Sequence, residues 1–86
     1  MEWIISFMIK AYILILTYVG NLKSVLNELK NLENIESIAV IAGDYDIIVK
    51  ARVNSLEELM ELTDKIHAIK GVKRTNTQVV EKEIEA

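Results

Sequence analysis

Residues 10–19 are hydrophobic at both alternating sets of strand positions. Ile13 and Ile15 fall on one side of an extended chain, and Leu14 and Leu16 fall on the other. β-branched and aromatic residues dominate this stretch, as they do in β-strands. Because a strand with two apolar faces is normally covered on both sides, the pattern predicts a central strand of a sheet over residues 10–19.

Two segments with a helical spacing of apolar residues lie further along the chain. The first follows Asn21, which is suited to the N-cap, and its apolar stripe runs to Leu32. The second opens with a capping box that begins at Ser55. The apolar stripe expected on this second helix is Leu56, Leu59, Met60, Thr63, Ile66 and Ile69. Asn34 and Gly71, which tolerate the left-handed backbone conformation, are predicted to end the two helices.

Three further strands are predicted from β-rich or alternating sequence. Residues 35–42 are rich in β-branched residues, and residues 46–53 alternate between apolar and polar positions. Between them, Gly43 followed by Asp44 predicts a tight hairpin, since glycine readily supplies a positive φ. Residues 73–80 begin polar on both faces, which favours a place at the edge of the sheet.

The predicted order is therefore β-α-β-β-α-β, and its two halves are similar where each helix joins the following strand. The positions that recur at a constant offset are Leu29, Leu32, Asn34 and Ile35, matched by Ile66, Ile69, Gly71 and Val72. This order predicts an α+β fold, the ferredoxin-like plait, with an antiparallel sheet and both helices on one face. The other face would be apolar along the first strand and uncovered, so we expect two sheets to pack face to face as a dimeric α+β barrel or sandwich.

Composition narrows the classes of function. The 86 residues suffice for one core, and 51% of them are hydrophobic. The absence of cysteine excludes a disulfide scaffold and a thiol nucleophile. The single histidine, His67, cannot form a multi-histidine metal site, and we expect no histidine-based triad. The net charge of −3, with scattered cations, does not fit a basic nucleic-acid surface. We expect no catalysis, no cofactor and no metal, and we expect His67 to be a solvated helix residue.

Three motifs follow one another at suitable spacing, and together they are specific. They are Gly43-Asp44-Tyr45-Asp46, Leu56-Glu57-Glu58-Leu59 and Gly71-Val72-Lys73-Arg74-Thr75-Asn76-Thr77. Over residues 9–81 the chain resembles the effector domain of the Lrp/AsnC transcription regulators, often called the RAM domain. Residues 1–8 would then be an apolar N-terminal extension and residues 82–86 a charged tail.

The resemblance implies how such a domain would work. Dimers would form through the open sheet faces and associate into a ring, an octamer or a decamer, with a small effector, usually an amino acid, at the contacts between dimers. Complete regulators of this family also carry an N-terminal helix-turn-helix domain, and residues 1–8 do not resemble one. We therefore expect an amino-acid-sensing module without direct DNA binding, with full-length Lrp/AsnC regulators as partners. We also expect it in the cytoplasm without membrane contact, because its N-terminal apolar runs fall short of the roughly 20 residues of a membrane span.

An amino-acid pocket needs a group for the carboxylate and acceptors for the ammonium. Backbone N–H groups of a glycine turn can bind a carboxylate, carboxylates accept from an ammonium, and threonines two residues apart share one strand face. The site residues expected at the family's matching positions are Gly43, Asp44, Tyr45, Asp46, Thr75 and Thr77. Each also has a purely structural interpretation: a turn glycine, an aspartate that bonds backbone N–H groups, a tyrosine at a subunit contact, or β-forming threonines.

Two other classes of protein share the predicted fold. One is a small dimeric α+β barrel enzyme, such as a monooxygenase or isomerase, which would need an acid or base that neither central strand carries. The other is the amino-acid-binding ACT domain, in which the turn at Gly20 and Asn21 would contact the ligand. Substituting Gly20 or Asp44 and measuring ligand affinity would separate the ACT interpretation from the RAM interpretation.

Overall fold

The computed structural model describes residues 8–86, in which four strands and two helices follow the predicted order. The elements are β1 (Ile9–Thr17), α1 (Leu22–Leu29), β2 (Ile35–Val40), β3 (Ile47–Val53), α2 (Leu56–His67) and β4 (Val72–Val79). The α+β ferredoxin-like fold is thereby confirmed. Apart from Met8, the extension predicted at residues 1–8 lies outside the described residues.

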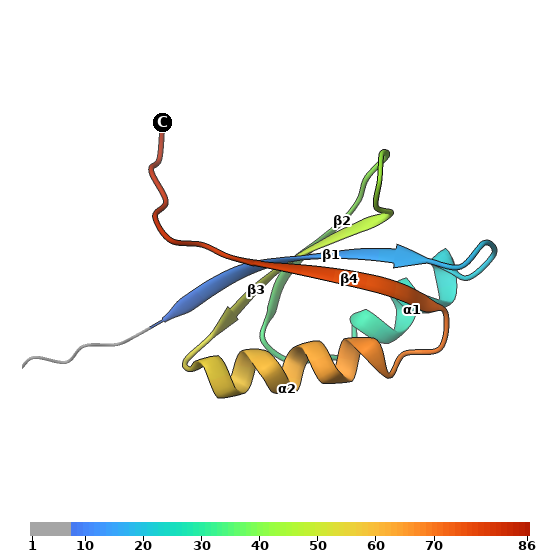
Figure 1. Ribbon diagram of the computed structural model, residues 1–86, viewed down its shortest axis with the longest axis horizontal. Helices are drawn as coiled ribbons and strands as arrows, with labels where there is room; N and C mark the ends of the chain where they lie inside the picture. The colour runs from blue at the N-terminus through green and yellow to red at the C-terminus, as the bar shows by residue number, and fades with distance from the viewer. Residues whose placement is uncertain (1–7) are drawn as a thin grey trace, which may run out of the picture.

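The strands form one antiparallel sheet in the order β2-β3-β1-β4 (Figure 1). The prediction of a central first strand is confirmed, because β1 pairs with β3 on one side and β4 on the other. Ile13 of β1 lies opposite Val49 of β3 and Thr77 of β4. Figure 1 shows both helices on one side of the sheet and the C-terminal segment leaving on the other side. The sheet therefore has one covered face, toward the helices, and one open face.

The hydrophobic core lies between the covered face and the two helices. Its buried members, all at most 5% exposed, are Ala11, Ile13, Ile15, Val25, Leu29, Ile47, Val49, Ala51, Val53, Leu59, Leu62 and Ile66. One detail of the predicted α2 stripe is wrong: Leu62 is buried, whereas Met60 is 65% and Leu56 60% exposed. Leu59, Leu62 and Ile66 share a helical stripe next to the predicted one, and packing on the sheet selects it.

The open face is covered by no helix of residues 8–86 and differs between its two ends. At the apolar end, Leu14 pairs with Ile48, and both are half-buried together with Leu16. At the charged end, Lys10 pairs with Arg52, and Tyr12 with Lys50. We use "apolar end" for Leu14, Leu16 and Ile48, and "charged end" for Lys10, Tyr12, Lys50, Arg52 and the acids that contact them.

The joint between α2 and β4 contacts the turn between β1 and α1. Asn34 (φ +71°) and Gly71 (φ +106°) are left-handed as predicted, although α1 already ends at Leu29 and not near Leu32. A Cβ atom on Gly71 would lie 2.7 Å from Cβ of Asn21, and Tyr18 N–H donates to the Gly71 carbonyl at 2.9 Å. Glycine is therefore required where the start of β4 passes the start of α1.

The two helix starts are built differently. The predicted capping of α2 by Ser55 is confirmed, because Ser55 Oγ accepts from Glu58 N–H at 3.1 Å. The returning bond differs from that of a capping box, since Glu58 Oε1 accepts at 2.9 Å from the N–H of Asn54, the residue before the N-cap. Asn21 occupies the N-cap of α1 as predicted, but its side chain makes no capping bond within the described chain. Its side chain thus contributes little of the stabilisation that an N-cap usually gives.

Candidate functional site

The connection between β2 and β3 is a six-residue loop, residues 41–46, which is wider than the tight hairpin predicted at Gly43 and Asp44. Ile41 N–H donates to the Asp46 carbonyl at 2.8 Å, which closes the loop. Asp46 N–H donates to the carbonyl of Ile15 on β1 at 2.9 Å instead of continuing the ladder with β2. Gly43 has the positive φ expected, +139°. The loop is therefore tied to the C-terminal end of β1.

The carboxylate of Asp46 reinforces this attachment. Its Oδ2 atom accepts from Thr17 N–H at 2.9 Å and from Thr17 Oγ1 at 3.0 Å. The structural interpretation of Asp46, an acceptor of backbone N–H groups, thus describes one of its two oxygens. No residue of the described chain donates to Oδ1. A half-buried carboxylate oxygen at this position can accept a further charge-assisted hydrogen bond.

Asp46 lines a cleft of about 460 Å³ at the end of β1. Residues 16–20 and Leu22 form its wall along β1 and the turn into α1, and Lys73 closes it from β4. The cleft therefore brings together Asp46 of the loop motif and Gly20 of the β1–α1 turn, two features that the sequence assigned to different families of amino-acid-binding domains.

Opposite charges meet in this cleft without neutralising each other. Among residues 8–86, neither Asp46 nor Lys73 forms an ion pair, and the Lys73 ammonium lies 5.9 Å from the centroid of the Tyr18 ring. Apolar side chains of Leu16, Val19 and Leu22 share the same cleft. An anionic acceptor, a cationic donor and an apolar wall match the three parts of a zwitterionic amino acid.

The other predicted site residues lie around this cleft rather than in it. Gly43 and Asp44 are exposed on the loop. The half-buried Tyr45 ring lies 5.6 Å from the Arg74 guanidinium, a cation–π distance. The motifs of the loop and of β4 therefore approach each other at Tyr45 and Arg74.

The two threonines of β4 lie on the covered face, because they pair with the buried Ile13 and Ile15 of β1. Thr75 Oγ1 is 2.7 Å from Nε2 of His67. We expected this histidine to contact only solvent; it is exposed, but it also lies within hydrogen-bond distance of Thr75. Thr75 and Thr77 share one face, as their spacing predicts. They do not converge with Asp46 on a common cavity within one chain.

Sequence reasoning missed Thr17 and Lys73 as candidate site residues. Thr17 interrupts an apolar strand with a hydroxyl, and Lys73 directly follows Gly71-Val72 in the third motif. Both features are visible in the sequence. Their convergence depends on the irregular pairing of β1 and β4, where the register shifts between Leu16 and Thr17.

Comparison with known proteins places the chain in a family. The model of the Lrp/AsnC ligand binding domain matches residues 10–86. The chain belongs to this family. The resemblance inferred from the three motifs is thereby confirmed.

Regulators of transcription are among the similar curated proteins. The HTH-type transcriptional regulator FL11 of Pyrococcus abyssi is 39% identical over 70 residues, which are 81% of this chain and 46% of the regulator. FL11 of Pyrococcus furiosus is 35% identical over 76 residues, 88% of this chain and 50% of the regulator. The chain thus spans about half the length of these relatives. A homocitrate synthase of Sulfolobus acidocaldarius is 36% identical over 61 residues, 71% of this chain but 13% of the synthase.

Solved structures share the fold of this Lrp/AsnC domain. TTHA0845 from Thermus thermophilus has a TM-score of 0.84 at 24% identity, covering 91% of this chain and 99% of that one. The structure of E. coli AsnC has a TM-score of 0.86 at 21% identity, covering 100% of this chain and 61% of that one. Within residues 8–86, neither helix is long and apolar enough to cross a membrane.

Proposed function

We propose that this Lrp/AsnC domain is a non-catalytic effector module that binds a free amino acid in the cleft between Asp46 and Lys73. The observation that carries the proposal is the pair of unneutralised opposite charges at one cleft. Asp46 Oδ1 would accept from the ligand ammonium, and the Lys73 ammonium would attract its carboxylate. The side chain of the ligand would lie against Leu16, Val19 and Leu22.

Two structural neighbours support amino acids as the first ligands to test. The regulator NMB0573 of Neisseria meningitidis and the feast or famine regulatory protein Rv3291c of M. tuberculosis were both solved with L-methionine. Their identities to this chain are 16% and 20%. A methionine-like or branched aliphatic side chain would remove apolar area of Leu16, Val19 and Leu22 from water, which a charged side chain would not.

Isothermal titration calorimetry with L-methionine, followed by the other nineteen amino acids, tests the site. We expect Asp46→Asn to weaken binding about ten-fold or more, since a charge-assisted bond of about 1.5–3 kcal/mol is lost. Asp64→Asn removes the same charge from the exposed surface of α2 and should leave affinity unchanged. Lys73→Met tests the carboxylate contact in the same way, and Lys30→Met, at the exposed C-cap of α1, is its control. Silence of the folded wild type toward all twenty amino acids would refute the sensing role.

We further propose that copies associate through their open sheet faces and that these dimers join into a ring. The apolar end supports this proposal, because Leu14, Leu16 and Ile48 have no helix over them in the described chain. The exposed tip of the β2–β3 loop, Gly43 and Asp44, would then complete the amino-acid site at the contact between dimers. Analytical ultracentrifugation should show an oligomer at micromolar concentration, and a monomer there would contradict the proposal.

Leu14→Lys separates association through the open face from association elsewhere. A lysine at this position would place a charge in the middle of the interface, so we expect a folded monomer. Met60→Lys adds the same charge to the exposed side of α2 and should leave the oligomer intact. An oligomer that survives Leu14→Lys but not Met60→Lys would move the interface to the helices.

The partner of the module is proposed to be a full-length regulator of the same family, consistent with the FL11 relatives. The partial match to homocitrate synthase supports a second candidate, an amino-acid-responsive module that associates with a biosynthetic enzyme. Native mass spectrometry of the chain mixed with each class of protein distinguishes them. Mixed oligomers with the regulator alone support the first partner, and mixed oligomers with the enzyme alone support the second.

A further inference from the structure

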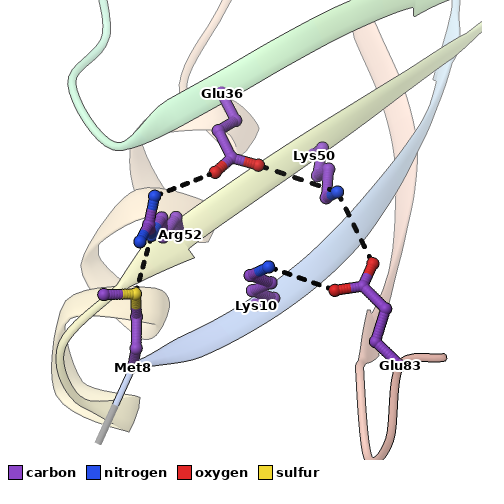
Figure 2. A network of polar contacts seen from close by, with 6 residues as sticks. All are labelled: Met8, Lys10, Glu36, Lys50, Arg52 and Glu83. Atoms are coloured by element: carbon purple, nitrogen blue, oxygen red, sulfur yellow. Dashed lines mark hydrogen bonds and ion pairs between the residues drawn. The ribbon is translucent and has the colours of Figure 1, made fainter. Parts of the chain in front are cut away.

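The charged end of the open face carries a connected network of ion pairs (Figure 2). Glu83, from the segment after β4, reaches Lys10 Nζ with Oε1 at 3.1 Å and Lys50 Nζ with Oε2 at 3.5 Å. Glu36 of β2 lies 3.8 Å from Lys50 Nζ and 3.3 Å from Arg52 Nη1. Two carboxylates thus connect cations from both central strands, β1 and β3.

Glu83 differs from Glu36 because it lies beyond the last strand. Val80 N–H donates to the Lys10 carbonyl at 2.9 Å, which directs the C-terminal segment along the start of β1. The segment then turns over the open face, so the Glu83 side chain lies above the sheet (Figure 2). The side chains of Lys10, Lys50 and Glu83 are each between 27% and 38% exposed, so the network is partly shielded from water.

The proximity of these groups shifts their pKa values in opposite directions. Hydrogen bonding and attraction from Lys10, followed by attraction from Lys50, lower the pKa of Glu83 below its usual value. Glu83, followed by Tyr12, raises the pKa of Lys50. The network holds three cations against two carboxylates. Without Glu83 the charged end would carry two excess positive charges instead of one.

We propose that Glu83 promotes self-association: it neutralises part of the charge at the charged end of the open face, so that a second copy of this chain can dock there. This inference rests on the proposed self-association through the open face. Two copies of one surface meet with the same excess charge, and any part of the charged end that becomes covered loses water that stabilised its cations. Glu83 reduces both costs, so the C-terminal segment determines how strongly copies associate and how strongly salt affects them.

The test compares Glu83→Gln with Glu85→Gln, which removes an equal charge from an exposed position outside all four ion pairs of the described chain. Sedimentation equilibrium gives the dimer dissociation constant at 50 and 500 mM salt. We expect Glu83→Gln to raise this constant about ten-fold at low salt and about three-fold or less at high salt, because salt screens the uncompensated lysines. Glu85→Gln should leave the constant within about two-fold of wild type.

A second variant checks the cause. Lys50→Met removes one of the cations that Glu83 neutralises, so Glu83→Gln in the Lys50→Met background should weaken the dimer less than it does in the wild type. Equal dissociation constants for wild type and Glu83→Gln, or a tighter dimer in the variant, would overturn the inference alone. A wild-type chain that stays monomeric at all concentrations would overturn the proposed self-association itself.

Discussion

The same strands form both faces of the sheet, but the two faces differ in burial and in charge. On the covered face, Ile13 and Ile15 of β1 are 0% exposed and lie in a core closed by α1 and α2. On the open face, the neighbouring Leu14 and Leu16 remain half-buried, and the same surface becomes an ion-pair network at its other end. One face is covered by the two helices, whereas the other combines half-buried apolar side chains with a network of ion pairs.

If copies associate as proposed, one alternating strand would separate folding from association. Positions that face the helices contribute to the core, and positions one residue away would contribute to the proposed contact between copies, because a strand directs successive side chains to opposite sides. Substitutions at adjacent positions should therefore have unlike consequences.

The sharpest test substitutes two neighbours. Ile13→Ala leaves a cavity in the core and should lower the free energy of unfolding by about 3 kcal/mol, whereas Leu14→Ala should cost about 1 kcal/mol. Urea denaturation measures both, at a protein concentration low enough that the midpoint no longer depends on it. Equal losses for the two variants would contradict the division of roles between the faces.

The packing of the helices on the sheet depends on the close contact between Gly71, at the start of β4, and Asn21, at the start of α1. Gly71→Ala would force a left-handed alanine and a Cβ atom 2.7 Å from Asn21, so we expect a loss of about 2 kcal/mol. Gly43→Ala carries the strain of positive φ alone, since no atom lies within 4 Å of its added Cβ, and should cost about 1 kcal/mol. Thermal unfolding followed by circular dichroism would rank the two, and the reverse order would show that the contact is easily relieved.

The N-cap residues of α1 and α2 should contribute differently to the free energy of unfolding. Ser55→Ala removes the bond that Glu58 N–H donates and should cost about 1 kcal/mol. Asn21→Ala keeps the Cβ atom and removes no capping bond, so we expect less than about 0.5 kcal/mol. Chemical denaturation of both variants would test this, and a larger loss for Asn21→Ala would assign its side chain a role outside capping.

The smallest effect concerns the open face in acid. Because Lys10 and Lys50 lower the pKa of Glu83, its ion pairs are present above the ordinary glutamate pKa and are lost as the pH falls through the lowered value. Carbon-13 NMR of the Glu83 carboxyl group should therefore give a midpoint below the usual glutamate range. Lys10→Met should raise that midpoint, and an unchanged midpoint would remove Lys10 from the network.

Much of the fold could be predicted because the period of the pattern is local. The alternation along β1 and β3 identified the residues of each face, and the left-handed residues Asn34 and Gly71 marked the joints. The predicted stripe of α2 includes Met60 instead of Leu62, because Met60 fits a helical spacing from Leu56 and Leu62 fits one from Leu59. Contact with the sheet decides between them, and that contact is not local.

The candidate site was predicted less completely for the same reason. The motif identified Asp46, but its partners Thr17 and Lys73 come from β1 and β4, far away in sequence. The spacing of Thr75 and Thr77 gave a shared face without saying which one, since only the register with β1 places them toward α2. Local patterns gave the residue types, and long-range pairing determined which of them meet.

The strand order makes the two similar halves depend on each other. β1 hydrogen-bonds to β3 and β4, both from the second half, and β2 of the first half pairs with β3. Neither half contains two strands that pair with each other, so neither half alone has a sheet. A half cut from the chain could form sheet hydrogen bonds only with a second polypeptide.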